Sequence, residues 1–348
     1  MTVGDLGEFG VIGRIAGRLP QGAAVLLGPG DDAAVLSAPD GRVVVSTDLL
    51  IEGRHFRRNW SSGYDIGRKA AAQNLSDIAA MGADPTAIFV GLGMPADVTT
   101  DWLDALTDGF RDECALVGAS VAGGDISRSD TVVLGVTALG DLGGRRPVTR
   151  SGALPGEVVA VAGRLGHAAA GLALLQAGRV GPDVVSGPSG PPEGVPRGGA
   201  EGRAVAGDGG FEELLSALVD AHRRPRPLYA CGPGAARLGA TAMLDVSDGL
   251  LQDLDHIAEA SGVRIELDPG AFPVGPALAA AGRALGADPL EWILTGGDDH
   301  AFAAVFPSDV RLPEPWLVIG RVTEGEGVHV AGRADTWGGW DHFRNSHD

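Results

Sequence analysis

Apolar positions along the chain fall into two patterns, short continuous runs and runs with helical spacing. Short apolar runs that end in polar or glycine residues predict strands at 43–48, 86–93, 131–139 and 158–163, and near 263–267, 301–306 and 316–321. Apolar positions that recur every three or four residues predict helices at 65–81, 101–117, 166–177, 211–221 and 249–260. The two halves join near residue 150. The pattern therefore predicts an α/β (α+β) fold with two domains, 1–148 and 149–348.

The predicted helix 65–81 carries an acid on its apolar stripe. We expect Asp65 to cap the start of this helix and Gly82 to end it. The stripe runs through Ile66, Ala70, Asn74, Asp77 and Met81. An unpaired carboxylate on such a face is costly, so Asp77 either makes a hydrogen bond between helices or shares a metal ion with another acid, and the second fits better. Lys69 and Arg68 are expected on a solvated face.

Composition and charge narrow the function classes. The chain has 348 residues and a net charge of −18, which disfavours nucleic-acid binding because such surfaces carry an excess of Lys and Arg. It has no apolar stretch of membrane-spanning length and no N-terminal secretion signal, so we expect a cytoplasmic protein without a membrane or nucleic-acid partner. Cys114 and Cys231 alone cannot form a disulfide framework or a zinc site. The Pro- and Gly-rich segment 178–210 is expected to be a mobile surface loop.

Acidic residues recur in motifs next to glycine or at the ends of predicted elements. The motifs are GPGDDAAVL (28–36), STDLLIEGRHF (46–56), VAGGDISRSD (121–130), MLDVSDGLLQDLDHIA (243–258) and LTGGDDHAF (294–302). Each alone can be a solvated turn, and Ser247 or Asp248 can simply cap a helix. Together they favour phosphoryl transfer, in which metal ions bridge the phosphates and neutralise charge. No Walker or protein-kinase motif is present, so the sequence predicts ATP binding through magnesium held by carboxylates.

The donors in these motifs suit Mg²⁺. Asp32 follows a glycine turn, and residues 46–48 place three oxygen donors together at a strand end. Asp125 follows two glycines that allow the backbone to approach a phosphate closely. Mg²⁺ prefers octahedral oxygen ligation that it shares with substrate phosphates. His55 can come near the same strand end, although a lone histidine is more often packed or solvated.

These motifs, with GRKAAAQNLSDIAAMGADP (67–85), TRSGALPGE and the terminal WGGWDHF, occur in the order found in thiamine-monophosphate kinases. The chain resembles this family from about residue 6 to residue 343, apart from 178–210. The resemblance implies transfer of the ATP γ-phosphate to thiamine monophosphate, which gives thiamine diphosphate and ADP. It also implies the fold of aminoimidazole ribonucleotide synthetase, in which the N-terminal domains of a homodimer form a β-barrel and the C-terminal domain covers the ATP site.

By motif, the resemblance assigns three groups of site residues. The metal positions are Asp32, Ser46, Thr47, Asp48, Asp77, Asp125, Asp245 and Asp248. The nucleotide positions are Gly124, Asp125, Arg150 and Ser247, and the thiamine-phosphate positions are His55, Asp298 and Trp340. Because the acceptor is already a phosphate, we expect no general base. Asp48, Asp77 and Arg150 are expected to support transfer together with several Mg²⁺ ions, by neutralising charge.

Two residues depart from the family pattern. The family usually has GGEDYE where this chain has GGDDHA, so Asp298 stands in place of a glutamate and His300 in place of a tyrosine. Two alternatives are another ATP-using enzyme of the same superfamily and a non-catalytic nucleotide-binding or assembly protein. Selenophosphate synthetase is disfavoured because no cysteine lies near the N-terminus, and the hydrogenase-maturation relative because none follows Cys231.

Overall fold

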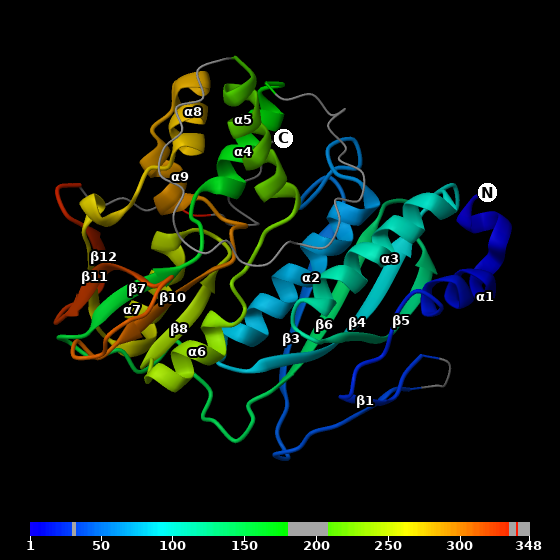
Figure 1. Ribbon diagram of the computed structural model, residues 1–348, viewed down its shortest axis with the longest axis horizontal. Helices are drawn as coiled ribbons and strands as arrows, with labels where there is room; N and C mark the ends of the chain where they lie inside the picture. Colours follow the sequence, from blue (N-terminus) through cyan, green and yellow to red (C-terminus); the bar gives the residue numbers. More distant parts are fainter. Residues whose placement is uncertain (30–32, 180–207, 334–338, 340–348) are drawn as a thin grey trace.

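The structure is a computed structural model, and it describes residues 1–29, 33–179, 208–333 and 339 (Figure 1). The N-terminal half contains α1 (Val3–Ala16), β1 (Val25–Leu27), β2 (Val35–Leu36), β3 (Val44–Ile51), α2 (Gly63–Ala80), β4 (Asp84–Met94), α3 (Thr100–Ala115), β5 (Ser120–Arg128) and β6 (Val133–Asp141). The C-terminal half contains β7 (Val158–Ala162), α4 (His167–Gln176), α5 (Asp208–Arg223), α6 (Cys231–Leu238), β8 (Ala242–Val246), α7 (Leu250–Ser261), β9 (Arg264–Leu267), the 3₁₀ helix η1 (Pro269–Ala271), α8 (Pro276–Leu285), α9 (Pro289–Thr295), β10 (Ala301–Phe306), β11 (Leu317–Thr323) and β12 (Gly327–Val330). The predicted mixed α/β architecture in two halves is confirmed.

The first sheet has the strand order β3-β6-β4-β5, in which only β4 and β5 are parallel neighbours. Helices α2 and α3 pack on one of its faces (Figure 1). Burial alternates along β3, where Leu50 is fully buried while Val45 and Leu49 are each 59% exposed. Successive side chains of a strand point to opposite faces. Ser46 and Asp48 therefore lie on the helix-covered face.

Helix α2 packs against both halves of the molecule. It contacts β3, β6 and α3 in its own half, and β8 and α6 in the C-terminal half. It approaches α3 closely, since a Cβ placed on Gly67 would lie 2.1 Å from the carbonyl oxygen of Leu106. A capping box closes its first turn, with Ser62 as the N-cap and Asp65 three residues later as its partner. The prediction that Asp65 is the N-cap is therefore wrong.

The second sheet has the order β12-β9-β11-β7-β10-β8. Every residue of β8 and β10 is buried, as expected for neighbouring strands with both faces covered. These two strands are antiparallel, and Val246 at the end of β8 pairs with Ala301 at the start of β10. The acidic turn after β8 and the acidic turn before β10 therefore meet at the same end of a rigid core.

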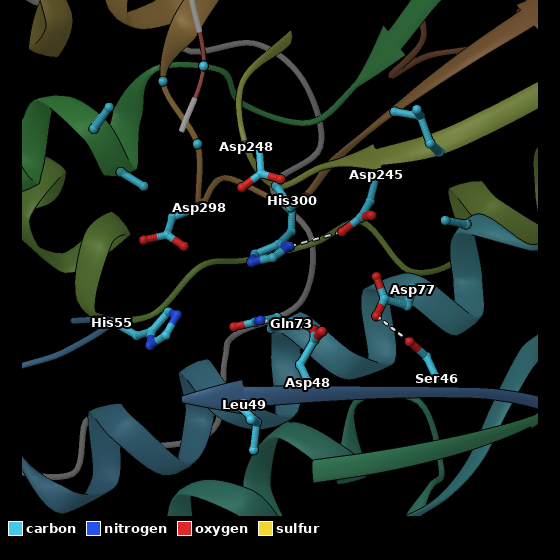
Figure 2. A pocket seen from close by; sticks show the side chains of 18 of the residues that line it. Ser46, Asp48, Leu49, His55, Gln73, Asp77, Asp245, Asp248, Asp298 and His300 are labelled. Atoms are coloured by element: carbon cyan, nitrogen blue, oxygen red, sulfur yellow. Dashed lines mark hydrogen bonds and ion pairs between the residues drawn. The ribbon is translucent and has the colours of Figure 1, made fainter. Parts of the chain in front are cut away.

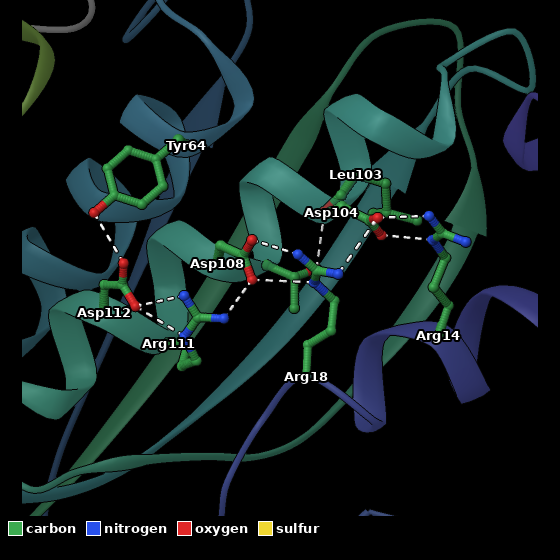
Figure 3. Close-up of polar contacts among 9 residues, drawn as sticks. Arg14, Arg18, Tyr64, Leu103, Asp104, Asp108, Arg111 and Asp112 are labelled. Carbon is green, nitrogen blue, oxygen red and sulfur yellow. Dashed lines mark hydrogen bonds and ion pairs between the residues drawn. The ribbon is translucent and has the colours of Figure 1, made fainter. Parts of the chain in front are cut away.

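A row of ion pairs attaches α1 and the residues directly after it to α3 (Figure 3). Arg14 pairs with Asp104, and Arg18 pairs with Asp108 one turn further along α3. Arg111 adds a 2.6 Å hydrogen bond to Asp108. Partly exposed pairs of this kind each contribute only about 0–1 kcal/mol, so the row specifies where α1 docks more than it stabilises the fold. The apolar pattern does not predict α1.

The structure corrects the predicted exposure of two residues on helix α2. Lys69 is 2% exposed and the Arg68 side chain is 13% exposed, so the prediction that they lie on a solvated face is wrong. The reason is that the C-terminal half and α3 cover sides of α2 that a single sheet would leave open. Most of 178–210 lies outside the described residues. Among the described residues, the longest apolar helical stretches fall short of what a membrane crossing requires.

Candidate active site

One cleft of about 1550 Å³ is lined by residues of both halves. Figure 2 shows carboxylates that enter it from opposite walls, Asp48 and Asp77 from the N-terminal half and Asp245, Asp248 and Asp298 from the C-terminal half. The sequence-predicted residues that line the cleft are Ser46, Thr47, Asp48, His55, Asp77, Arg150, Asp245, Ser247, Asp248 and Asp298. The fold thus brings most of the dispersed acidic motifs to one place.

Strand β3 and helix α2 build the N-terminal wall of the cleft. Ser46 Oγ donates a hydrogen bond to Asp77 Oδ2 at 2.6 Å, and Gln73 Nε2 donates to Asp48 Oδ2 at 2.9 Å. The hydroxyl of Thr47 differs, because it donates to a carbonyl of β6 at 3.0 Å on the other face of the sheet. The contribution of Thr47 to the cleft therefore comes from its backbone.

The carboxylates repel one another at this end of the cleft. Burial, followed by the charges of Asp245 and Asp48, raises the pKa of Asp77 to about 7. A divalent cation would relieve this repulsion, and an all-oxygen donor set is the one that Mg²⁺ prefers. No three acid or histidine side chains within the described ranges are already arranged as a finished metal site. Asp32, the remaining acid assigned to this end, lies outside those ranges.

His300 packs against the acid at the end of β8. His300 is 1% exposed, and its Nδ1 lies 2.9 Å from Asp245 Oδ2, which also accepts a 2.9 Å hydrogen bond from Ser76 Oγ. Two polar groups thus hold one oxygen of Asp245. The histidine that replaces the family tyrosine therefore orients a predicted metal-binding acid.

Asp253 shapes the turn that follows β8. Its Oδ2 accepts hydrogen bonds from the backbone N–H groups of Ser247, Asp248 and Gly249, at 3.0, 3.0 and 3.1 Å. Asp253 is 3% exposed, and burial, followed by the charges of Asp248 and Asp245, raises its pKa to about 7. This buried acceptor fixes the predicted nucleotide-binding turn.

The other end of the cleft contains His55 and Asp298 (Figure 2). His55 Nδ1 accepts a hydrogen bond from the backbone N–H of Ile51 at 3.0 Å. Asp298 Oδ2 accepts a 2.9 Å hydrogen bond from Nζ of the buried Lys69. Burial raises the pKa of Asp298, but the charge of Lys69, with a smaller contribution from His300, outweighs burial and holds that pKa well below its ordinary value. Asp298 is therefore ionised.

The segment that carries Asp298 has a strained backbone. Asp298 and His300 have φ angles of 65° and 52°, a region that side chains other than glycine rarely adopt. Asp299 between them is buried and accepts hydrogen bonds from the backbone N–H groups of Gly166 and Ala168, at the start of α4. This anchor offsets the strain and directs Asp298 into the cleft.

The remaining predicted residues are placed differently. Arg150 lines the cleft with an exposed side chain. Gly124 and Asp125 are exposed on β5, at the far edge of the first sheet from β3, and do not line the cleft. Trp340 lies outside the described residues, although its neighbour Gly339 lines the cleft.

Sequence reasoning missed Gln73, Asp253 and His222, and misplaced Lys69. Gln73 precedes Asp77 by one helical turn, so the spacing on α2 is a signal that finds it. Asp253 follows the DVSDG turn within the same acidic motif. His222 carries no sequence signal, because it lies at the end of α5 and enters the cleft only through the packing of the two halves.

Comparisons with known proteins agree with this geometry. The family model of the N-terminal domain of AIR synthase related proteins matches residues 30–142, and that of the C-terminal domain matches residues 191–332. A thiamine-monophosphate kinase of Mycobacterium tuberculosis is 47% identical over 345 residues, which cover 98% of this chain and 93% of that protein. The crystal structure of a thiamine-monophosphate kinase from Stenotrophomonas maltophilia K279a is 34% identical, with a TM-score of 0.77 and coverage of 96% and 99%. A structure described as AaThiL complexed with AMPPCP and TMP is 28% identical, with a TM-score of 0.73 and coverage of 99% of each chain.

The fold with its two large sheets and the cleft lined by acids define an AIR synthase related protein. Both halves of the chain match that class, and the relatives cover nearly its whole length. The chain belongs to the thiamine-monophosphate kinase family.

Proposed function

We propose that this protein transfers the γ-phosphate of ATP directly to thiamine monophosphate, giving thiamine diphosphate and ADP. The observation that carries the proposal is a single cleft with oxygen donors at one end and His55 and Asp298 at the other. A donor phosphate and an acceptor phosphate can then meet between the two ends. We also place the domain boundary between residues 148 and 149, in the connection from β6 to β7.

The oxygen donors at the acidic end of the cleft are the kind that Mg²⁺ prefers, so we propose the magnesium site there. Asp48, Asp77 and Asp245 supply carboxylate oxygens there, with Ser46 and the backbone of Thr47 beside them. With Mg²⁺ held there, this end of the cleft would supply positive charge that neutralises the phosphoryl group during transfer. Asp32 and Asp248 are proposed as further ligands on the family motif.

The chain's own residues orient the two phosphates. Arg150 can clamp a phosphate of ATP with two parallel hydrogen bonds, and the turn held by Asp253 presents Ser247 to the nucleotide. Because His55 Nδ1 accepts a hydrogen bond from Ile51, the neutral imidazole carries its proton on Nε2 and donates from there. The acceptor phosphate has a second pKa of about 6, so at neutral pH it needs no general base.

A homodimer accounts for the position of Asp125. The register Leu49–Gly135–Gly91–Asp125 crosses the first sheet from β3 to β5, a distance of about 14 Å at the usual strand spacing. Asp125 therefore lies far from Asp48 of its own chain. We propose that β5 of a second copy lies alongside β3, so that the two sheets close into a barrel and each site receives Asp125 from the other chain. The apolar side chains of Val45 and Leu49, exposed on the uncovered face, would then line its interior.

Mixing two inactive variants tests this arrangement. Asp48→Asn and Asp125→Asn proteins, unfolded together and refolded, would form mixed dimers in which one of the two sites has both acids. Random pairing makes half of the dimers mixed, so we expect about a quarter of the wild-type activity. No recovery in the mixture, with both variants dimeric by light scattering, would place Asp125 in the site of its own chain and refute the shared site.

The activity itself is tested by incubation with ATP, Mg²⁺ and thiamine monophosphate. We expect thiamine diphosphate and ADP in equal amounts, and no product when a chelator removes the metal. ADP without thiamine diphosphate would indicate a different acceptor and a related activity of the superfamily. A protein that binds ATP without consuming it would be a nucleotide-binding module, and the proposal would fail.

A further inference from the structure

Three polar residues meet behind the acceptor end of the cleft. Lys69 Nζ donates to Asp298 Oδ2 at 2.9 Å and to the backbone carbonyl of His222 at 3.3 Å. His222 Nδ1 lies 4.0 Å from the same carboxylate oxygen. Lys69 comes from α2, His222 from the end of α5 and Asp298 from the loop before β10, so the group joins both halves of the molecule.

This corner of the cleft is balanced in charge. The ammonium of Lys69 and the carboxylate of Asp298 cancel. Burial, followed by the charge of Lys69, lowers the pKa of His222 to about 3, so the imidazole is neutral. The thiazolium cation of the acceptor therefore gains little from a carboxylate that already has its counter-ion, because the net charge facing it is near zero.

Asp298 and His222 can still make hydrogen bonds to a ligand in the cleft. Lys69 occupies Asp298 Oδ2, and the Asp298 side chain, which is 39% exposed, lines the cleft. His222 Nδ1 has no hydrogen-bond partner within the described residues, although the His222 side chain is 7% exposed and lines the same cleft. An ionised carboxylate can only accept hydrogen bonds. Buried polar atoms normally have partners, so this corner fits a ligand that brings N–H donors.

We propose that Asp298 accepts a hydrogen bond from the pyrimidine amino group of the acceptor. Lys69 is the positioning residue, because it leaves Asp298 Oδ1 free to accept that N–H. His222 Nδ1 is a second polar contact. The inference rests on the proposed function, because thiamine monophosphate is the ligand that brings this amino group. The shorter aspartate suits the role here, since Lys69 fixes it to the wall of α2.

Wild-type selectivity is the first measurement. Oxythiamine monophosphate has an oxygen in place of the pyrimidine amino group and keeps the thiazolium charge and the phosphate. It would place an acceptor against Asp298, and leaving a buried polar group unpaired costs about 10–100-fold in kcat/KM. We expect that preference for thiamine monophosphate, with an unchanged KM for ATP. A counter-ion role for Asp298 predicts equal use of both acceptors.

Asp298→Asn tests the direction of the hydrogen bond. Lys69 can donate only to the amide oxygen of the new side chain, so the amide N–H₂ must face the acceptor. We expect the preference for thiamine monophosphate to fall by at least about tenfold, and oxythiamine monophosphate to be used better than by the wild type. Asp309→Asn makes the same chemical change at an exposed turn after β10 and should keep the wild-type preference.

Lys69→Met tests positioning, because methionine keeps the bulk of the stem and removes the donor. We expect KM for thiamine monophosphate to rise about tenfold or more, with KM for ATP and the mid-point of urea unfolding recorded alongside. Lys69→Met combined with Asp298→Asn should cost less than the two single effects together, since no unpaired charge remains.

The outcomes separate this inference from the proposed function. If the wild type phosphorylates thiamine monophosphate but does not discriminate against the oxygen analogue, or if Asp298→Asn keeps the wild-type preference, the inference is overturned and the kinase activity stands. If the wild type phosphorylates neither acceptor, the proposed function fails first. The comparison of the two acceptors needs no variant, so it decides the point even where a variant does not fold.

Discussion

Asp77→Asn separates two effects of the acid cluster, its destabilisation of the fold and its contribution to the rate of the proposed reaction. Without metal, burial and the charges of Asp245 and Asp48 raise the pKa of Asp77 from 3.8 to about 7. A shift of that size corresponds to about 4 kcal/mol against the ionised form, and the partial exposure of the side chain reduces this to about 1–3 kcal/mol. Asparagine keeps an acceptor for Ser46 and carries no charge. We therefore expect the metal-free variant to be more stable than the wild type at pH 8 by about 1–3 kcal/mol.

The gain depends on pH in a fixed direction. Well below pH 4 the carboxyl is protonated in the folded and unfolded states alike, so it adds nothing to the pH dependence. From about pH 4 to about pH 7 the unfolded chain releases the proton and the folded protein retains it, so the wild type loses stability as the pH rises. Asp77→Asn lacks this loss, so its advantage should be roughly a third to a half of its full size near pH 5 and largest above pH 7.

The activity of Asp77→Asn should fall, although its stability rises. A metal site at the transferring phosphate contributes several kcal/mol, so we expect Asp77→Asn to lose at least about 100-fold in kcat with excess Mg²⁺. Urea unfolding in EDTA at about pH 5 and pH 8 measures the first effect, and thiamine diphosphate formation measures the second. Asp309→Asn serves as the exposed control. A variant that is less stable than the wild type at pH 8 in EDTA, or that keeps more than about a tenth of kcat, would refute the reasoning.

Three further predictions concern the scaffold. His222 is neutral in the folded protein, where its pKa is about 3 against an ordinary 6.5, so it contributes stability above about pH 6.5 that is lost as the pH falls. Between pH 7 and pH 5, the free energy of unfolding of His222→Phe, measured in urea, should therefore fall by about 2 kcal/mol less than that of the wild type. Asp253→Ala leaves three backbone N–H groups without their acceptor, so it should lower the free energy of unfolding by about 2–4 kcal/mol and raise KM for ATP, and an unchanged KM would contradict the role of the turn. Tyr229→Phe removes a buried 2.6 Å hydrogen bond to Glu113, so it should cost about 1–2 kcal/mol in urea unfolding with kcat unchanged, and a fall in kcat would show that this network reaches the cleft.

The sequence predicted the elements whose periodicity is strong. The run AFAAVF is apolar at every position and forms β10, which is buried throughout, and the predicted strand 43–48 lies almost wholly within β3. Helix α1 could not be found this way, because its glycine-rich sequence has no clear apolar stripe and its place depends on ion pairs with α3. Strand β5 was missed for a related reason, since its GGD triplet is typical of a turn and becomes a strand only by pairing with β4.

The candidate site shows the same division between local and tertiary information. The acids were predictable because oxygen donors that recur beside glycine or near the ends of elements favour metal and phosphate chemistry over a set of unrelated solvated turns. Residues 46–48 were expected at a strand end, but they lie in the middle of β3, because the strand continues to Ile51. Lys69 was misplaced because an apolar stripe reports one packed face, whereas α2 is covered by elements of both halves. His222 lies 153 positions from Lys69 in the sequence, and no local pattern relates the two.

Helix α2 explains how the two ends of the cleft keep their spacing. Lys69, Gln73 and Asp77 follow one another at intervals of four residues, so the first and last are about 12 Å apart along a rigid rod. Asp77 lies at the acidic end, where we propose the metal, Gln73 holds Asp48, and Lys69 holds Asp298 at the proposed acceptor end. Since one helix makes all three contacts, the acidic end and the acceptor corner can move apart only if a side-chain contact of Gln73 or Lys69 breaks. A change at Lys69 should therefore alter the choice of acceptor while the metal end keeps its geometry.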